Sequence, residues 1–335
     1  MRRALLRSGI AALVVLILGA SWAFQEYRSF TEQSLRLPEG ETLYAIPPGT
    51  TLAGVAADLK RRGYLDKPLY LRLLARKRGE ASRIKAGEFK LPAGITPPRL
   101  LDLFVSGEVT QYAITIIEGW SFKQLILGIS THSALEHTLA GVPPEEIMER
   151  LGHGGVHPEG RFLPDTYNFP KGTTDASFLK RAYRALERRL TTEWESRAPD
   201  LPLETPYEAL ILASIVEKET GRVEERARIA GVFTRRLKKG MKLQTDPTVI
   251  YGMGDRYDGN IRRRDLREET PYNTYVHKGL TPTPIAMPGA DALHAALHPA
   301  EGKSLYFVAN GDGSHQFSAT LKEHNNDVRK YQLKR

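Results

Sequence analysis

The chain has 335 residues, which is long for one core, so two folded units are expected. Hydrophobic residues make up 41% of it, enough to argue against a long disordered chain, and the absence of cysteine excludes disulfides, zinc–thiolate sites and thiol nucleophiles. The formal net charge of +9 favours an anionic partner, which could be nucleic acid, an anionic lipid surface or a carboxylate-bearing polymer.

Residues 1–26 have the pattern of a membrane anchor. An uncharged run from Ser8 to Gln25 is long enough to cross a bilayer as a helix. The cations that precede it are Arg2, Arg3 and Arg7. They predict a cytoplasmic N-terminus and a single pass through the inner membrane, with the remaining chain in the periplasm or otherwise outside the cytoplasm. A cleaved signal peptide is the alternative, because Ser21 and Ala23 are small enough to flank a cut site. Export in either form argues against nucleic acid as a partner.

A local pattern recurs three times after a polar stretch, residues 27–42, that predicts a linker. It consists of a β-prone stretch, a turn with glycine, a hydroxyl residue and an amphipathic helix. The turn glycines are Gly49, Gly94 and Gly119, and the hydroxyl residues that can cap the following helices are Thr51, Thr96 and Ser121. The pattern predicts a small α+β domain over residues 43–110, and residues 111–335 are expected to form a larger α+β domain.

A glutamate ends the apolar stripe of the helix that is expected to begin after Thr205. The letters T-P-Y-E predict a capping box, and the run A-L-I-L-A-S-I-V-E-K-E-T predicts a helix that stops near Gly221. The stripe consists of Ile211, Leu212, Ile215 and Val216, and Glu219 follows it at helical spacing. Burial there would raise the pKa of Glu219 and suit it to general acid catalysis, whereas a solvated helix end is the alternative. Glu217 falls on a smaller, more polar face and is expected at the surface.

Six motifs carry a resemblance to one family. They are E-G-R-F-L-P-D-T-Y (159–167), A-S-I-V-E-K-E-T (213–220), R-L-K-K-G-M-K-L-Q-T-D-P-T-V-I-Y-G (236–252), P-Y-N-T-Y (271–275), P-I-A-M-P-G (284–289) and L-Y-F-V-A-N-G-D-G-S-H-Q-F (305–317). With these motifs in this order, the chain resembles the endolytic murein transglycosylases of the MltG, or YceG-like, family. Met287 is a departure, since a polar Asn or Thr is more typical there, and it puts a polar contact from this position in doubt.

The resemblance implies a lytic transglycosylase, a carbon–oxygen lyase that acts on peptidoglycan, with a LysM-like first domain. It implies cleavage of the MurNAc–GlcNAc bond within nascent glycan strands, which leaves 1,6-anhydro ends. Glu219 is the implied catalytic residue, first as acid and then as base, with Glu217 as the runner-up. No cofactor is implied. Peptidoglycan strands and the inner membrane are the implied partners, with peptidoglycan synthases as further candidates and no nucleic acid.

Polar and aromatic residues in the later motifs are candidates for binding sugars. They are Gln244, Thr245, Asp246, Tyr272, Asn273, Tyr275 and His315. For Asp246 a capping role in a turn is an equal alternative. Metal binding is not expected, because H-E-x-x-H is missing and the pair His294 and His298 has only Asp291 as a nearby acid in the sequence.

Two other functions remain open. A non-catalytic peptidoglycan-binding or scaffold protein of the cell envelope would have no need of the acid on the A-S-I-V-E-K-E helix. A peptidoglycan glycoside hydrolase would need a second carboxylate, for which Asp246 is the first candidate. Reducing-end analysis of the products separates these functions.

Overall fold

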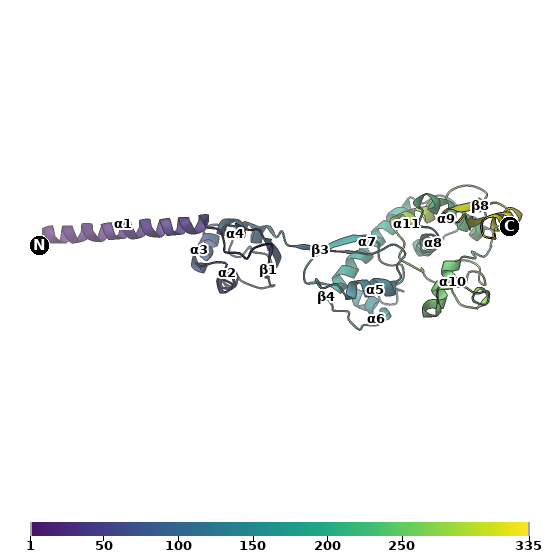
Figure 1. The fold of residues 1–335 in the computed structure, drawn as a ribbon, viewed down its shortest axis with the longest axis horizontal. Coiled ribbons are helices and arrows are strands. Elements are labelled where there is room, and N and C mark those ends of the chain that lie inside the picture. The colour runs from purple at the N-terminus through teal and green to yellow at the C-terminus, as the bar shows by residue number, and fades with distance from the viewer. Residues whose placement is uncertain (1, 334–335) are drawn as a thin grey trace. The chain divides into compact units, whose positions relative to one another are not determined.

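The computed structural model describes residues 2–333, without the side chains of residues 2–9, 11 and 12. Its elements are helices and short two-stranded sheets, so the predicted α+β class is confirmed (Figure 1). The chain divides into two compact units. The first runs to Tyr112 and includes Pro170–Gly172, and the second comprises Ala113–Phe169 and the chain from Thr173 onward.

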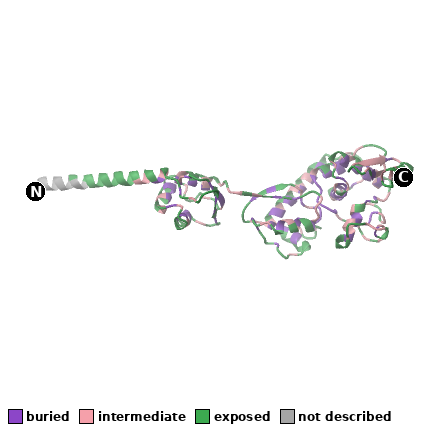
Figure 2. Cartoon of the chain, viewed as in Figure 1, coloured by how far each residue is buried: buried purple, intermediate pink, exposed green. Residues whose placement is uncertain are grey.

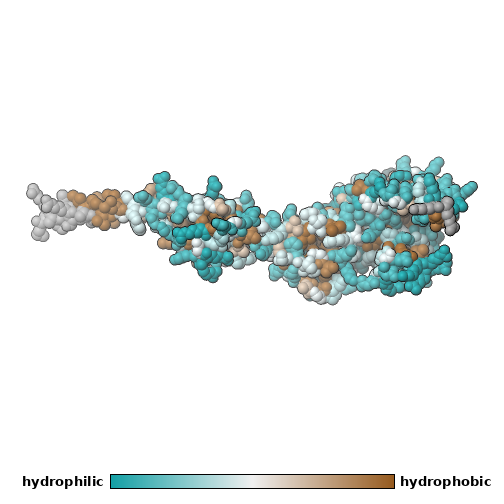
Figure 3. Space-filling model, viewed as in Figure 1, coloured by the Kyte–Doolittle hydropathy of each residue, from teal (hydrophilic) through white to brown (hydrophobic). Residues whose placement is uncertain are grey.

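Helix α1 (Arg2–Glu32) carries many exposed apolar side chains (Figure 3). The large ones that are described are Ile10, Leu13, Val14, Val15, Leu16, Ile17, Leu18, Trp22 and Phe24. Within the described residues, no helix combines the length and the apolar character needed for a membrane crossing. The predicted span includes residues 8, 9, 11 and 12, and its flanking cations are Arg2, Arg3 and Arg7, all of whose side chains lie outside the described part. The anchor therefore stays a prediction.

The first unit builds its core on a two-stranded antiparallel sheet. Its elements after α1 are β1 (Thr42–Ile46), α2 (Leu52–Arg61), α3 (Pro68–Lys77), β2 (Gly87–Leu91) and α4 (Pro97–Ser106). Tyr44 pairs with Phe89 across the sheet, and both rings pack against Phe104. Phe30 and Leu35 are buried in the same core. Residues 27–42 are therefore partly core and not simply a polar linker, because two apolar side chains spaced along a polar stretch are enough to dock it.

The predicted glycine turns are confirmed. Gly49, Gly94 and Gly119 have φ angles of 78°, 77° and 76°, in the left-handed region that other residues resist. The caps differ among the three helices that follow. Thr51 accepts a hydrogen bond from the Gly54 N–H, and Ser121 forms a complete capping box, but Thr96 makes no side-chain bond. Two prolines open the helix that follows Thr96, α4, so its first two residues have no N–H to donate to a cap.

The second unit is mainly helical. Its elements are β3 (Gln111–Thr115), α5 (Phe122–Ser130), β4 (Leu135–Glu136), α6 (Pro144–Leu151), β5 (Thr166–Pro170), β6 (Thr173–Thr174), α7 (Asp175–Glu195), α8 (Pro206–Glu219), α9 (Val223–Lys238), α10 (Asp246–Met253), the 3₁₀ helices η1 (Gly254–Arg256) and η2 (Asp265–Arg267), α11 (Ala290–Leu297), β7 (Tyr306–Ala309), β8 (His315–Ser318) and α12 (Leu321–Tyr331). Strand β3 pairs with β5, β4 runs parallel to β6, and β7 and β8 form an antiparallel hairpin.

Helix α8 is the centre of this unit (Figure 2). Every residue from Ala209 to Val216 is buried, and α7, α9 and α11 pack around the helix. Even the polar Ser214 is enclosed: its hydroxyl donates to the Ile211 carbonyl at 2.7 Å and accepts the Ile285 N–H at 3.0 Å. The predicted stripe thus extends around the whole helix, and the core leads directly to Glu219 at its end.

Candidate active site

Local sequence signals set both ends of α8. The Thr205 hydroxyl accepts the Glu208 N–H at 3.2 Å, as predicted. The Glu208 carboxylate reaches back to the Glu204 N–H at 2.5 Å, one residue earlier than a capping box requires. At the other end Thr220 is extended, with φ −148°, so Glu219 is the last helical residue. The helix therefore delivers a carboxylate where its buried part ends.

Glu219 lines a cavity of about 500 Å³, a volume typical of small-ligand sites. Helices α8, α9, α10 and α12 and the β7–β8 hairpin contribute the walls. Of the residues named from the sequence, those that line the cavity are Glu219, Gln244, Thr245, Asp246, Tyr275 and His315. Segments separated by almost a hundred residues therefore meet at one place.

The environment of Glu219 suits proton transfer near neutral pH. Burial raises the pKa of its carboxyl from the usual 4.5 to about 7, and the charge of Asp246 adds to the rise. A hydrogen bond from the Thr245 hydroxyl to Oε1 and the charge of Arg236 oppose it. With a pKa in this range the carboxyl can both give and take a proton, which is what a general acid and base requires.

Thr245 is held by a network of threonines. It is 3% exposed, and its N–H donates to the Thr274 hydroxyl at 3.1 Å. The Thr248 hydroxyl lies 2.8 Å from that same hydroxyl and 2.7 Å from the Thr245 carbonyl oxygen. These bonds fix the start of α10 and thereby the hydroxyl that meets Glu219.

Asp246 and Tyr275 form a pair at the cavity wall. The Tyr275 hydroxyl donates to Asp246 Oδ1 at 2.6 Å. Burial and this bond both raise the pKa of Tyr275, so its hydroxyl keeps its proton. Next to the pair, Gln244 has φ 52°, a left-handed conformation, and its N–H donates to the Thr274 carbonyl at 3.1 Å. Backbone strain of this kind in a non-glycine residue is common at functional sites.

Tyr272 and Asn273 do not line the cavity. Asn273 is 1% exposed, and its amide donates to the carbonyl oxygens of Asp265 and Glu268. The Tyr272 hydroxyl lies 2.9 Å from that of Thr283. Asn273 thereby holds the loop that carries Tyr275, and its expected contact with sugar is replaced by a structural role. Tyr272 is half-buried, and its contact with sugar stays a prediction. The sequence does not show which hydrogen-bond partners the fold brings to the polar groups of these two side chains.

The cavity residues that the sequence analysis did not name include Arg236, Tyr306 and His324. The Arg236 guanidinium lies 4.9 Å from the centroid of the Tyr306 ring, and the His324 ring stacks on Tyr306 at 5.2 Å. Arg236 also donates to the carbonyl oxygens of Leu305 and Leu243, at 2.6 and 2.8 Å. It belongs to the basic run R-R-L-K-K, which has the pattern of a solvated surface, so only its burial distinguishes it.

Glu217 is buried, and its predicted surface position is wrong. Its side chain is 6% exposed, and its carboxylate accepts the Gly289 N–H and pairs with Arg226, each at 3.0 Å. Burial raises the pKa of Glu217, although both partners oppose the rise. The residue therefore ties α8 to α9 and to the loop before α11. The helix face that carries Glu217 was predicted to be exposed, because the sequence does not show that the loop before α11 covers it.

Met287 belongs to that covering loop. Its side chain is fully buried, and its main chain exchanges hydrogen bonds with the turn of Gly119 and Trp120, at 2.9 and 2.7 Å. An apolar residue fits this position, and the polar contact that the departure put in doubt is replaced by backbone bonds.

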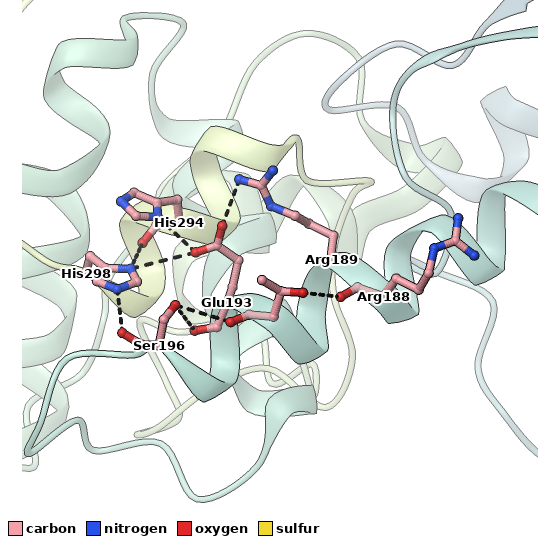
Figure 4. A network of polar contacts seen from close by, with 7 residues as sticks. Arg188, Arg189, Glu193, Ser196, His294 and His298 are labelled. Atoms are coloured by element: carbon pink, nitrogen blue, oxygen red, sulfur yellow. Dashed lines mark hydrogen bonds and ion pairs between the residues drawn. The ribbon is translucent and has the colours of Figure 1, made fainter.

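Among the described residues, one group could hold a metal ion: Glu193, His294 and His298 (Figure 4). Glu193 comes from α7, about a hundred residues before the two histidines, so no local pattern pointed to it. The two rings stack 4.2 Å apart and only 18° from parallel, which aims their in-plane lone pairs side by side and not at one point. Arg189 already supplies a cation to Glu193 at 2.7 Å. The geometry is that of an ion-pair network at the end of α11.

Comparisons with known proteins match residues 44–330 to the model of the YceG-like family. A Bacillus subtilis (strain 168) protein named endolytic murein transglycosylase is 32% identical over 306 residues, which cover 85% of this chain and 83% of that protein. A Streptococcus pneumoniae protein of the same name is 24% identical, over 95% of this chain and 64% of that protein. The 2.6 Å crystal structure of a yceG-like protein from Listeria monocytogenes has a TM-score of 0.53 and 26% identity, covering 86% of this chain and 99% of that one.

The raised pKa of Glu219 predicts a pH-dependent stability. An unfolded glutamate ionises near pH 4.5, but the folded one ionises near 7, so stability is full below the lower value and falls as the pH rises to the higher one. Glu219→Gln should abolish this loss and be more stable than the wild type at pH about 8, by up to roughly 3 kcal/mol. Urea unfolding at pH about 5 and about 8 measures it.

The quantity to compare is the change in unfolding free energy between the two pH values, in the variant and in the wild type. Burial also raises the pKa of Glu159 to about 7, and its contribution is common to both proteins. Glu224→Gln, at an exposed position of α9, is the matched control and should behave as the wild type does. Equal pH dependence in Glu219→Gln and the wild type would contradict the burial of Glu219.

Proposed function

This chain belongs to the YceG-like family, and we propose that it is a lytic transglycosylase that cuts peptidoglycan with Glu219 as its acid and base. Its relatives from Bacillus subtilis and Streptococcus pneumoniae bear the name endolytic murein transglycosylase. The observation that carries the proposal is a carboxyl whose burial raises its pKa to about 7, at the wall of a cavity of about 500 Å³. A scaffold protein would gain nothing from a carboxyl in this state.

The reaction needs a single carboxyl. Protonated Glu219 gives its proton to the oxygen that leaves C1 of N-acetylmuramic acid, and the C1–O bond breaks. The N-acetyl group of the same sugar helps to stabilise the cation. The Glu219 carboxylate then takes the proton of the C6 hydroxyl, whose oxygen bonds to C1 and closes a 1,6-anhydro ring. Water does not enter, and Glu219 ends protonated as it began.

The neighbours of Glu219 support both steps. Burial favours the neutral acid that starts the reaction. The Thr245 hydroxyl, which donates to Oε1, stabilises the carboxylate that forms after the first transfer. Because the threonine network fixes this hydroxyl, the oxygen that carries the mobile proton is held in place.

Asp246 argues for this reaction over hydrolysis. It lines the same cavity, so it is the carboxylate that a hydrolase would use. However, its Oδ1 already accepts the Tyr275 hydroxyl at 2.6 Å, and the residue occupies the first turn of α10. These contacts favour a role in positioning the wall, and product analysis tests it.

Glu219→Gln should fold, bind glycan strands and lose about 10²–10⁴-fold of the cutting rate, because glutamine has no proton to give to the leaving oxygen. Purified peptidoglycan digested with the wild type should yield 1,6-anhydro ends, which mass spectrometry shows as products lighter by one water than hydrolysis products. Glu224→Gln serves as the charge-matched control and should cut normally. Reducing ends from the wild type would make the enzyme a hydrolase, and unimpaired cutting by Glu219→Gln would remove Glu219 from the reaction.

The acid role also predicts a pH profile. Glu219 must be protonated before the bond breaks, so kcat/KM should fall as the pH rises through about 7. Initial rates on isolated glycan strands, measured between pH about 5 and about 9, give the profile. A rate that keeps rising above pH 8 would exclude a glutamic acid with this pKa as the proton donor.

We also propose how the enzyme is attached. The uncharged run Ser8–Gln25 with its arginine flank supports a single-pass inner-membrane anchor with the site on the periplasmic side, where nascent strands and peptidoglycan synthases would be within reach. The net charge of +9 and the resemblance to LysM-like domains support binding of glycan by residues 43–110.

Protease added to spheroplasts should therefore degrade the catalytic unit, and deletion of residues 1–32 should release the chain from membranes. Deletion of residues 43–110 from Glu219→Gln should reduce its co-sedimentation with insoluble peptidoglycan. Protection from the protease would reverse the topology, and unchanged sedimentation would make the first domain a spacer.

A further inference from the structure

Glu225 contacts His315 with both of its carboxylate oxygens. Its Oε1 accepts the His315 backbone N–H at 2.9 Å, and its Oε2 lies 2.7 Å from the ring nitrogen Nδ1. Glu225 belongs to the first turn of α9, and His315 begins strand β8. The two side chains are 8% and 12% exposed, so water competes little for these bonds. A single buried residue thus sets both the backbone and the ring of His315.

These two contacts decide which ring nitrogen of His315 carries the hydrogen. Burial alone would raise the pKa of Glu225, but the bonds from His315 outweigh it and lower the pKa, so the group is a carboxylate and can only accept. Nδ1 must therefore be the donor. In a neutral imidazole the other nitrogen, Nε2, then bears the lone pair. Phe307 meets the ring edge-on, with centroids 5.4 Å apart, and limits its rotation.

His315 lines the cavity that contains Glu219, so Nε2 is the ring nitrogen left for a ligand there. A second contact braces the hairpin that carries it. Arg222, in the short connection between α8 and α9, donates to the Asp312 carbonyl at 2.8 Å. The connection that follows Glu219 and the turn that precedes His315 are thereby held together.

We infer that Glu225 is a positioning residue, which keeps His315 in the Nδ1–H tautomer so that Nε2 accepts a hydrogen bond from a hydroxyl or acetamide N–H of the N-acetylated sugar beside Glu219. The inference rests on the proposed function for the identity of the ligand. It explains why a carboxylate is buried where it reaches no ligand itself, because that carboxylate sets the ring of a residue that lines the cavity.

Glu225→Gln tests the inference because glutamine reverses the tautomer. The His315 backbone N–H can only donate, so the amide oxygen must face it. The amide NH₂ then faces Nδ1, which has to become the acceptor, and Nε2 becomes an N–H. The change turns an acceptor in the cavity into a donor while it preserves the shape. We expect kcat/KM for glycan cutting to fall by about 10- to 100-fold, with folding retained.

The ¹⁵N NMR shifts of the imidazole report the tautomer directly, and a merely structural clamp would not predict their coupling to activity. Wild-type His315 should show Nδ1–H, and Glu225→Gln should show Nε2–H. Glu224→Gln, which removes the same charge one residue earlier at an exposed position, should change neither the shifts nor the rate. Should Glu225→Gln not fold, the wild-type tautomer and the rate of His315→Phe, which lacks the acceptor, decide instead.

The outcomes separate this inference from the proposed function. An Nε2–H tautomer in the wild type overturns the inference whatever the protein cuts. A reversed tautomer with an unchanged rate also overturns it and leaves Glu225 as a clamp. If the wild type has the expected tautomer and binds glycan but cuts nothing, the proposed function fails, while a weaker glycan affinity of Glu225→Gln still supports the inference. A chain that binds no glycan refutes both.

Discussion

The enclosure of α8 is the constraint on which the second unit depends. The helix is buried around its whole circumference from Ala209 to Val216, and its last residue lies three positions further on, at the wall of the cavity. That residue is Glu219, and burial raises its pKa to about 7. The helix dipole, negative at this end, works in the same direction. The same packing that stabilises the unit therefore raises the pKa of the carboxyl into the range for proton transfer, and the cavity beside it has room for the group that takes the proton.

Two glutamates that are two positions apart on this helix show how neighbouring residues decide a role. Glu217 meets Arg226 and the Gly289 N–H, which occupy its carboxylate and turn it into a tie between α8, α9 and the loop before α11. A Cβ at position 289 would clash with the Glu118 side chain, which would have to shift to admit a larger residue. Glu219 accepts a hydrogen bond from the neutral Thr245 hydroxyl, and the proton of the Glu219 carboxyl stays available for transfer. Both carboxyls are buried, but only one of them faces the cavity.

Buried neighbours hold the side chains that line the cavity in position. Thr274 and Thr248 fix Thr245, and Glu225 fixes His315. Arg236 bonds to carbonyl oxygens of two separate segments and places its guanidinium against Tyr306. Most of these bonds join segments that are far apart in the chain. The site is therefore a product of the packing of the unit, and its geometry is rigid because its supports are buried.

Local signals in the sequence determined the turns at Gly49, Gly94 and Gly119, the cap of α8, and a glutamate at the end of an apolar helix. These features depend on backbone conformation and side-chain period within a few residues, which the sequence contains in full. Motif order also identified the family. Tertiary structure alone decided that Glu217 is buried, that Phe30 and Leu35 dock in a core, that Asn273 turns inward, and that Glu193 meets His294. Which partners meet in such contacts is set by the packing of whole helices and loops, a property that no local pattern encodes.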